Sequence, residues 1–477
     1  MSSMPNGQHS SFPPVKLYTT LHDLYLDGKQ GPLEETLCVI KPNSDTKYGE
    51  VVPFNNKYTI HSAQVGSADD LAHLQMEINC YLLMFYAGPM QVVFIGVAEG
   101  QSDDDTLKKD TIHANAQRSF SVIDNTYTDS DAFVKQHPQS SPLHFAFALD
   151  FAQSLPYIHS PDKIYKLNSK RWLAECPLRS ANDTIIDCAI PPQKLFSSSQ
   201  TERSAAIDAE IARVKQILLD RPPYVLKLTQ SLSSVGTLIV RDEKEREEVI
   251  RKAEEYLKEY LPRITKENDY LFPTSLILSD FIPGETMALN FFVKGSGEVV
   301  FLGACHQLST GESGRQATAI TFQEQEKLEK KYRDVLDHIG EVLHGEGYRG
   351  PCGADVMEDP ESGRLFVIDL NVRSALSLVL YTLKDHLNGE REFEMALVYE
   401  CVMLKIDRDE VEKKFAKEFE SARLILMGST RLGSKEQWAY GMILAGNDQD
   451  DIDKLSDRIL EFEIEGGQHG DVADAAA

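Results

Sequence analysis

The chain has 477 residues, 42% of them hydrophobic, which predicts roughly two to four structural units with substantial buried cores. Its 49 basic and 74 acidic residues leave a formal net charge of −25, which repels nucleic acid and anionic lipid and argues against both as partners. The seven cysteines have no paired spacing, so we expect reduced thiols in the cytoplasm rather than a disulfide or zinc framework.

The first 160 residues predict a small α/β layer. Residues 1–15 are expected to be disordered, and they lack the basic segment and apolar run of a secretory signal. Apolar strands are predicted at 36–40, 91–97 and 144–149, although 145–154 could equally begin a helix. The uncharged stretch 80–98 approaches the length of a membrane span, but Gly88-Pro89 divides it into a helix and a strand.

Three amphipathic helices are predicted at 205–219, 244–260 and 323–344. A further helix is expected at 376–387, and the acidic segments from 390 to 422 are expected to continue in helices. Strands at 423–427 and 440–446, a helix at 450–462 and a mobile tail at 466–477 complete the chain. This C-terminal strand–strand–helix could be a small lid or an oligomerisation unit.

Two short segments carry the most informative residues. The segments 350–357 and 365–373 have the pattern of strands, and a turn at 358–364 joins them. Asp355 in the first strand and Asp369 and Asn371 in the second would converge as hard oxygen ligands, which Mg²⁺ requires when it bridges nucleotide phosphates. A single acid beside a strand would not suggest a site, but two acids across a hairpin do.

This pattern resembles the metal-binding end of ATP-grasp enzymes, a superfamily of ATP-dependent carboxylate–amine ligases. There, one acid lies on a strand and the next strand ends in an acid followed by Asn and often Arg, positions that correspond here to Asp355, Asp369, Asn371 and Arg373. The resemblance implies that the first three hold Mg²⁺ or Mn²⁺. It also implies that Arg373 contacts the substrate and stabilises an oxyanion.

The chain departs from the superfamily pattern at two of these positions. The superfamily more often has Glu where this chain has Asp369, and the shorter side chain must bring the backbone or the ion closer. Several members carry an Arg where this chain has Gly353, so that role is vacant or passes to Arg373, Arg349 or Arg315.

The resemblance extends upstream to residues expected at the phosphates of ATP. Asp162-Lys163 resembles the pair that begins the ATP-binding half, and Lys227 lies on a predicted strand, 224–228, that a small-residue loop follows. The implied phosphate contacts are Lys163, Lys227, Ser233, Ser234 and Gly236. Taken alone, Lys227 is equally explained as a surface lysine with a buried stem.

A hinge that resembles the adenine-binding segment follows the predicted strand 276–279. The backbone from Asp280 to Ile282 is expected to read the edge of adenine, with Phe281 and Ile282 against the base. Glu285 is expected at the ribose hydroxyls.

The strand that begins at 299 enters a polar loop, which in this superfamily often meets the substrate. His306 and Arg315 are therefore candidate substrate contacts, although an exposed loop needs no such role. Arg315 joins Lys227 and Arg373 as the implied catalytic residues.

The resemblance implies an ATP-grasp fold at 161–385. An N-terminal α/β domain at 16–160 would precede it, and a helical and strand–strand–helix extension at 386–465 would follow. The expected activity is ATP- and Mg²⁺-dependent ligation of a small carboxylate to an amine through an acyl phosphate. The sequence leaves the oligomeric state open, with a homodimer as one option. The alternative is an ATP-binding regulatory or scaffold protein that has kept the fold without turnover.

Overall fold

The structure is a computed structural model that describes most of the chain. The described residues are 12–13, 15–26, 36–40, 57–61, 78, 82–83, 85–88, 90–95, 122–127, 134–135, 142–145, 147–178, 181–219, 223–231, 236–310, 315–431 and 437–464. Most of the segment predicted to be disordered, the tail predicted to be mobile, and Ser233 and Ser234 lie outside these residues.

The N-terminal unit is a parallel four-stranded sheet, as the α/β prediction requires. Its order is β3-β2-β1-β4, formed by β1 (Thr36–Ile40), β2 (Gln91–Ile95), β3 (Val122–Tyr127) and β4 (Leu143–His144). Helix α1 (Leu21–Leu26) precedes it. The sequence did not predict β3, and the strand predicted at 144–149 ends at His144, before the 3₁₀ helix η1 (Asp150–Ala152).

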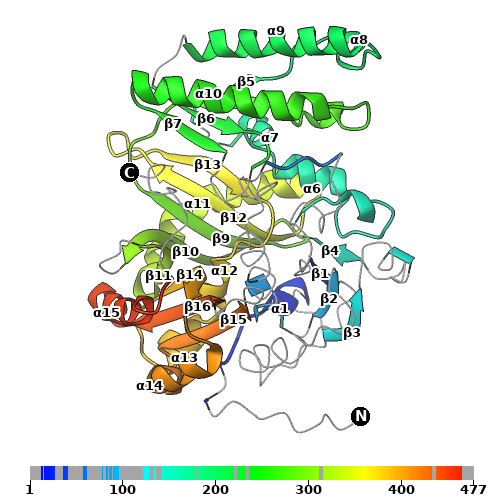
Figure 1. Ribbon diagram of the computed structural model, residues 1–477. Coiled ribbons are helices and arrows are strands. Elements are labelled where there is room, and N and C mark those ends of the chain that lie inside the picture. Colours follow the sequence, from blue (N-terminus) through cyan, green and yellow to red (C-terminus); the bar gives the residue numbers. More distant parts are fainter. Residues whose placement is uncertain are drawn as a thin grey trace.

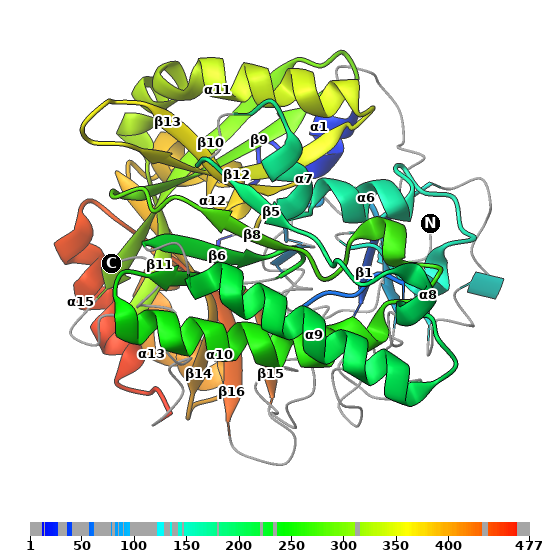
Figure 2. The same cartoon turned by 90° about the horizontal axis from the view of Figure 1, so that it is seen from above.

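A second, antiparallel sheet of four strands, the small sheet, lies at the top of Figure 1. Its order is β5-β8-β6-β7, from β5 (Thr184–Ile186), β6 (Tyr224–Leu228), β7 (Thr237–Val240) and β8 (Leu276–Ser279). One face packs against α9 (Gln200–Leu219) and α10 (Glu243–Tyr260), which run side by side in Figure 2. The predicted apolar stripe of α9 is buried there, which leaves the opposite face of the sheet to meet the rest of the molecule.

The large sheet has eight strands in the order β13-β12-β9-β10-β11-β14-β16-β15. These are β9 (Thr286–Val293), β10 (Val299–Thr310), β11 (Arg315–Thr321), β12 (Gly350–Glu358), β13 (Leu365–Asn371), β14 (Met395–Leu404), β15 (Leu424–Arg431) and β16 (Trp438–Gly446). Helix α11 (Gln325–Gly345) packs on one face at the β13 end. The N-terminal unit and α12 (Leu378–Thr382) pack on the other face.

The C-terminal part differs from its prediction. The segment 395–404 is the strand β14, not part of a helical run, and only α13 (Arg408–Lys414) and α14 (Ala416–Glu420) are helical in the acidic stretch that follows. β14 lies between β11 and β16, where its nearly continuous apolar sequence is buried on both faces. The predicted strand–strand–helix therefore continues the large sheet, and α15 (Gln449–Leu460) packs beside it.

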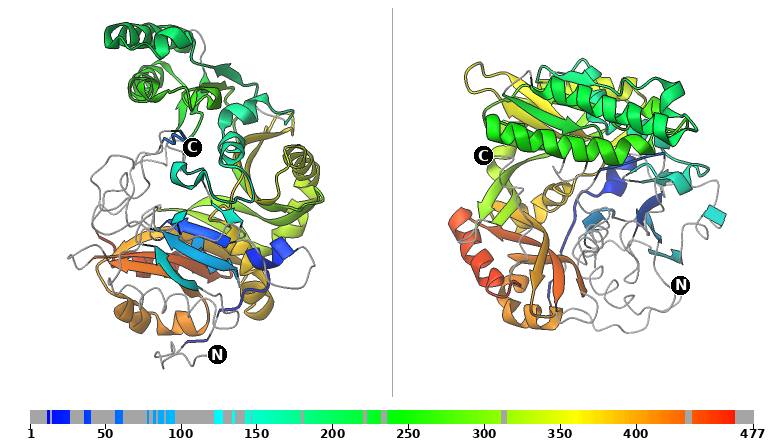
Figure 3. Two further views of the ribbon diagram at one scale, coloured as in Figure 1. Left: turned by 90° about the vertical axis from the view of Figure 1, so that its right-hand side faces the viewer. Right: turned by 45° about the horizontal axis from the view of Figure 1, so that its top comes forward.

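Two short helices, α6 (Pro161–Leu167) and α7 (Lys170–Glu175), connect the N-terminal unit to the small sheet. The left view of Figure 3 shows the small sheet and its helices projecting beyond the large sheet, with this connection alongside. In the described part of the chain, no helix is both long enough and apolar enough to cross a membrane.

Candidate functional site

Two carboxylates face each other at the edge of the large sheet. Asp355 of β12 is the direct antiparallel partner of Asp369 of β13, and Gly353 pairs with Asn371 two residues away. Because side chains alternate along a strand, Asp355, Asp369 and Asn371 project from the same face. The structure therefore brings together the three residues expected to bind the metal.

The pKa values of the two acids are shifted in opposite directions. Burial and the negative charge of Asp369 raise the pKa of Asp355 above its ordinary value. Burial also disfavours the charged form of Asp369, but the positive charges of Lys170 and Lys227 outweigh it, and the pKa of Asp369 is lowered. The pair is therefore negative on the Asp369 side, and a cation beside Asp355 would relieve the repulsion between the two acids.

Lys227 reaches this pair from the small sheet. Its neighbours Leu226 and Leu228 point into the helix-covered core, so Lys227 points to the opposite face, toward β13. Its Nζ donates to the carbonyl of Ile368 at 2.7 Å. Ile368 is the extra residue of a bulge between the Asp355–Asp369 and Val356–Val367 pairs. Burial lowers the pKa of Lys227.

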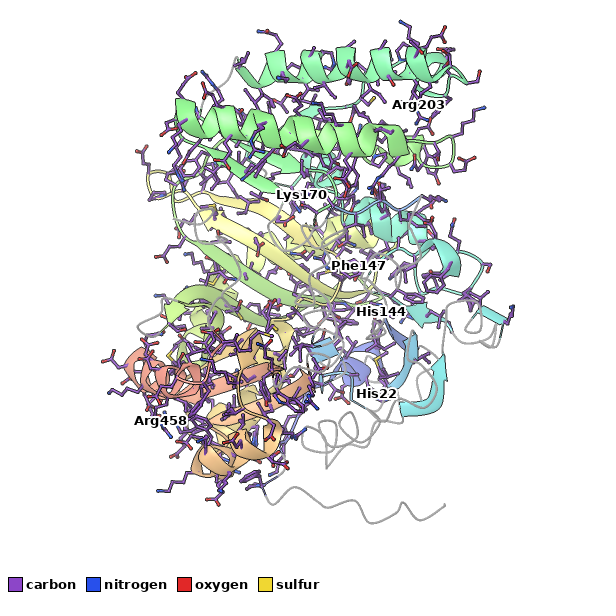
Figure 4. All side chains as sticks on the ribbon, in the orientation of Figure 1. His22, His144, Phe147, Lys170, Arg203 and Arg458 are labelled. Carbon is purple, nitrogen blue, oxygen red and sulfur yellow. The ribbon has the colours of Figure 1, made fainter. Side chains whose placement is uncertain are left out.

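Lys170, which the sequence did not select, makes the direct ion pair. Its Nζ lies 3.2 Å from Oδ2 of Asp369, and its side chain is 9% exposed. Figure 4 shows Lys170 between the small and large sheets. Lys170 follows the N-cap Ser169 as the first residue of α7, an unfavourable place for a cation in the helix dipole. Because Lys170 and Asp369 lie far apart in the chain, no spacing in the sequence indicated their contact.

Arg373 lies just beyond β13 and close to both acids. Its Nη1 donates to Oδ1 of Asn168 at 2.9 Å, and its Cζ lies 5.4 Å from the centre of the Phe147 ring. Burial lowers the pKa of Arg373, although the charges of Asp369 and Asp355 oppose that effect. At Gly353, where the resemblance led us to expect Arg, an added Cβ would lie 3.2 Å from Cβ of Ala375.

The predicted adenine hinge connects the two sheets. Residues 280–285 lead from β8 of the small sheet to β9 of the large sheet. The Asp280 amide donates to the carbonyl of Ala181 at 2.8 Å, so this N–H is committed within the protein. Phe281 and Ile282 are half-buried, and Glu285 is exposed.

An acid near this hinge escaped the sequence analysis. Asp183 accepts a hydrogen bond from Ser279 Oγ and also acts electrostatically on Lys227. Gly236, predicted at the phosphates, has its carbonyl bonded to the Leu228 amide at 2.8 Å.

Two of the predicted residues, His306 and Lys163, are not brought to the two acids in the described structure, and a third, Arg315, is described only in its backbone. His306 pairs with Met287, which pairs with Val356, so it projects from the face of the large sheet opposite to Asp355. Its Nε2 lies 3.7 Å from Oε2 of Glu324. Arg315 begins β11, but its side chain lies outside the described residues. Lys163 is on α6, with Nζ beside Gly347.

The donor set at the two acids suits a hard cation. In the described residues, no group of three or more His, Cys, Asp or Glu side chains is placed to bind a metal ion. The candidate site has instead two carboxylates and the amide of Asn371 on one face. Oxygen donors in this number suit Mg²⁺, which usually takes one or two carboxylates and completes its shell with substrate phosphates and water.

Comparisons with known proteins give structural matches. No protein-family model matches the sequence, and no curated protein matches it. The phosphoribosylamine–glycine ligase of Thermotoga maritima matches with a TM-score of 0.50 and 12% identity, over 90% of this chain and 96% of that one. The L-amino acid ligase of Bacillus licheniformis matches with a TM-score of 0.46 and 12% identity, over 91% and 98%.

An N5-carboxyaminoimidazole synthetase from Staphylococcus aureus, solved with ADP, gives a TM-score of 0.46 and 11% identity over 91% and 98% of the two chains. At such identities a match shows only a shared fold. We base the fold of this chain on the Thermotoga maritima structure, which has a TM-score of 0.50.

Proposed function

We propose that this chain, which has the ATP-grasp fold, is an ATP- and Mg²⁺-dependent ligase that joins a carboxylate to an amine. One observation carries the proposal: two facing acids of the large sheet meet lysines that arrive from the small sheet and from α7. This combination of acids and lysines suits a polyphosphate bound together with a divalent cation. The acids would repel the polyphosphate if it bound alone, and the lysines would repel the cation if it bound alone.

The nucleotide would lie between the two sheets. Its phosphates would contact Lys227 and Lys170, and Lys163 remains a further candidate. Because the Asp280 N–H already donates to Ala181, adenine would use the Asp280 carbonyl and the backbone at Ile282. Phe281 would pack on the base, and Glu285 would bind the ribose hydroxyls.

Asp355, Asp369 and Asn371 would hold Mg²⁺, or Mn²⁺ in its place. The ion would neutralise part of the charge on the terminal phosphates. Asp355 supports the assignment because burial, and after it the charge of Asp369, raises its pKa, and a bound cation would stabilise its ionised form. Lys170 would keep Asp369 ionised before nucleotide arrives.

The reaction would need two steps, since a carboxylate is a poor electrophile until one of its oxygens becomes a leaving group. In the first, the substrate carboxylate attacks the γ-phosphorus of ATP, giving an acyl phosphate and ADP. In the second, the amine attacks the acyl carbon and inorganic phosphate leaves. Lys227 and Lys170 would orient the phosphates, and Arg373 would stabilise the oxyanion of the second step.

Product analysis tests the proposal. With ATP, Mg²⁺ and a panel of amino acids and small acids, we expect release of ADP and phosphate in equal amounts, and hydroxylamine should trap the activated acid as a hydroxamate. AMP and pyrophosphate would refute the acyl phosphate. Binding of ATP without turnover under every condition would favour the scaffold alternative.

A further inference from the structure

The junction between α6 and α7 is bonded to both sheets of the candidate site. Toward the small sheet, Ser169 Oγ lies 2.9 Å from Oγ1 of Thr229, and the Lys170 amide donates to the Thr229 carbonyl at 2.9 Å. Thr229 follows Lys227 by two residues. Toward the large sheet, Lys170 pairs with Asp369, and Asn168 contacts the residues just after β13. This junction therefore sets where the two halves of the site meet.

Asn168 uses its whole side-chain amide in these contacts. Its Oδ1 accepts from the Val372 amide at 3.0 Å and from Nη1 of Arg373 at 2.9 Å. Its Nδ2 donates to the carbonyls of Val372 at 3.2 Å and Ile164 at 2.9 Å. Asn168 thus bonds both the N–H and the C=O of Val372, as a residue of a neighbouring strand would. Its Oδ1 also holds the guanidinium of Arg373.

Among the described residues, no acid lies at contact distance from the Arg373 guanidinium. Within the described residues, no ion pair includes Arg373, although Asp355 and Asp369 are near enough to act on it electrostatically. A mobile guanidinium would be drawn onto these carboxylates, because charge-assisted pairs are stronger than bonds to neutral groups. The neutral Oδ1 of Asn168 and the ring of Phe147 hold it elsewhere.

We propose that Asn168 is a positioning residue that keeps Arg373 available to an anionic ligand and away from Asp355 and Asp369. A neutral acceptor suits this role, because it orients a cation without cancelling its charge. The identity of the ligand, the carboxylate or acyl phosphate of the reaction, rests on the proposed function. The positioning itself can be tested without turnover.

Hydrogen exchange tests the contact between Asn168 and Val372 on which the positioning depends. In Asn168→Ala, the Val372 amide loses its acceptor, so peptides spanning 369–376 should exchange about tenfold faster or more. Asn388→Ala is the matched control, since Asn388 also donates from a half-buried side chain to a backbone carbonyl, that of Phe393 at 2.7 Å. It should leave 369–376 unchanged. Unchanged exchange in Asn168→Ala would overturn the proposal, whether or not a substrate is known.

Turnover then tests the link to Arg373, with ADP release in the presence of hydroxylamine as the readout. Asn168→Ala should lower kcat about tenfold or more and change KM for ATP less than about twofold. In an Arg373→Ala background it should cost nothing further, because the residue it positions is gone. Additive losses in the double variant would refute the proposal.

A second variant serves if Asn168→Ala does not fold. Asn168→Asp keeps the acceptor for Val372 and Arg373 but adds a charge that neutralises the guanidinium. Exchange at 369–376 should stay slow while kcat falls, whereas wild-type kcat in this variant would contradict the proposal. If the wild-type protein releases no ADP with any acid, the proposed function fails, whereas unchanged exchange in Asn168→Ala overturns the positioning by itself.

Discussion

At the scale of single residues, Asp355 and Asp369 face each other yet should respond oppositely to neutralisation. Burial and the charge of Asp369 raise the pKa of Asp355, which means that the folded protein disfavours its ionised form. Asp355→Asn removes that charge, so the metal-free protein should gain stability, on the order of 1 kcal/mol. Asp369→Asn leaves the buried Lys170 without its partner and should destabilise. Thermal unfolding with a chelator present measures both.

Both variants should also lose the stabilisation that Mg²⁺ and ATP give the wild type, because each lacks a metal ligand. Asp359→Ala, in the turn of the same hairpin, is the control and should keep it. Equal stability changes in the two Asn variants would contradict the electrostatic asymmetry, and retained Mg²⁺ response would contradict the metal assignment.

The lysines of α6 and α7 give a second prediction. Lys170→Met should weaken binding of a fluorescent ATP analogue about tenfold or more. The Lys170 ammonium pairs with Asp369, a proposed metal ligand, and would therefore lie beside the phosphates that the ion binds. Lys163→Met tests the residue that the resemblance selected. Lys166→Met is the control, since Lys166 pairs with Glu346 on the surface. Wild-type affinity in Lys170→Met would exclude this lysine from the phosphate site.

The sequence predicted the three metal-binding candidates, which share a local motif, and it predicted Lys227 through the resemblance, but it missed Lys170 and Asn168, which meet the site only in the fold. Asp355, Asp369 and Asn371 lie within one hairpin, so the hairpin pattern was enough to place them together. Asn168 contacts Val372 across 204 positions of the chain. No spacing rule encodes such a contact, because it depends on how α6 packs against the large sheet.

At the scale of elements, strong helical periodicity was informative and short apolar runs were ambiguous. The helices α9, α10 and α11 begin and end within a few residues of their predicted bounds, except that α9 starts five residues earlier. The strand β14 was misread as helix because acidic residues flank it on both sides. Its apolar run is buried on both faces, so it lacks the alternation that marks a half-buried strand.

The position of β14 predicts a large effect of truncating its side chains. Leu397 is fully buried between β11 and β16, so Leu397→Ala should lower the free energy of unfolding by about 2–5 kcal/mol. Leu219→Ala, the same change at a residue 46% exposed, should cost about 0.5 kcal/mol or less. Urea unfolding midpoints compare them, and similar midpoints would contradict the central place of β14.

At the scale of the whole molecule, Asp162 joins three parts that the sequence could not arrange. It lies on α6 and accepts hydrogen bonds from Tyr58 and from Tyr270, which belongs to the 3₁₀ helix η3 (Asp269–Leu271) before β8. Lys57 pairs with it at 2.9 Å. Asp150 of the N-terminal unit in turn holds the Lys57 amide at 2.9 Å. The carboxylate of Asp162 on α6 is thus bonded both to the N-terminal unit and to η3, which precedes β8 of the small sheet.

This arrangement predicts a pH dependence. Burial would raise the pKa of Asp162, but hydrogen bonds from Tyr270, Tyr58 and Lys57 outweigh it and lower that pKa. A lowered pKa means that the unfolded chain binds the proton more readily, so the contribution to stability is present at neutral pH and is lost as the pH falls through the folded-state value. Asp162→Asn should therefore be less stable than wild type at pH 7, and the difference should shrink on acidification.

Thermal unfolding and limited proteolysis of both proteins across that range provide the measurement. Asp334→Asn, on the exposed side of α11, is the control and should leave the stability close to that of wild type. In Asp162→Asn at pH 7, new cleavage should fall between the N-terminal unit and the small sheet, because the carboxylate that ties them has lost its charge. A stability difference that stays constant with pH would show that the bonds of Asp162 do not depend on that charge.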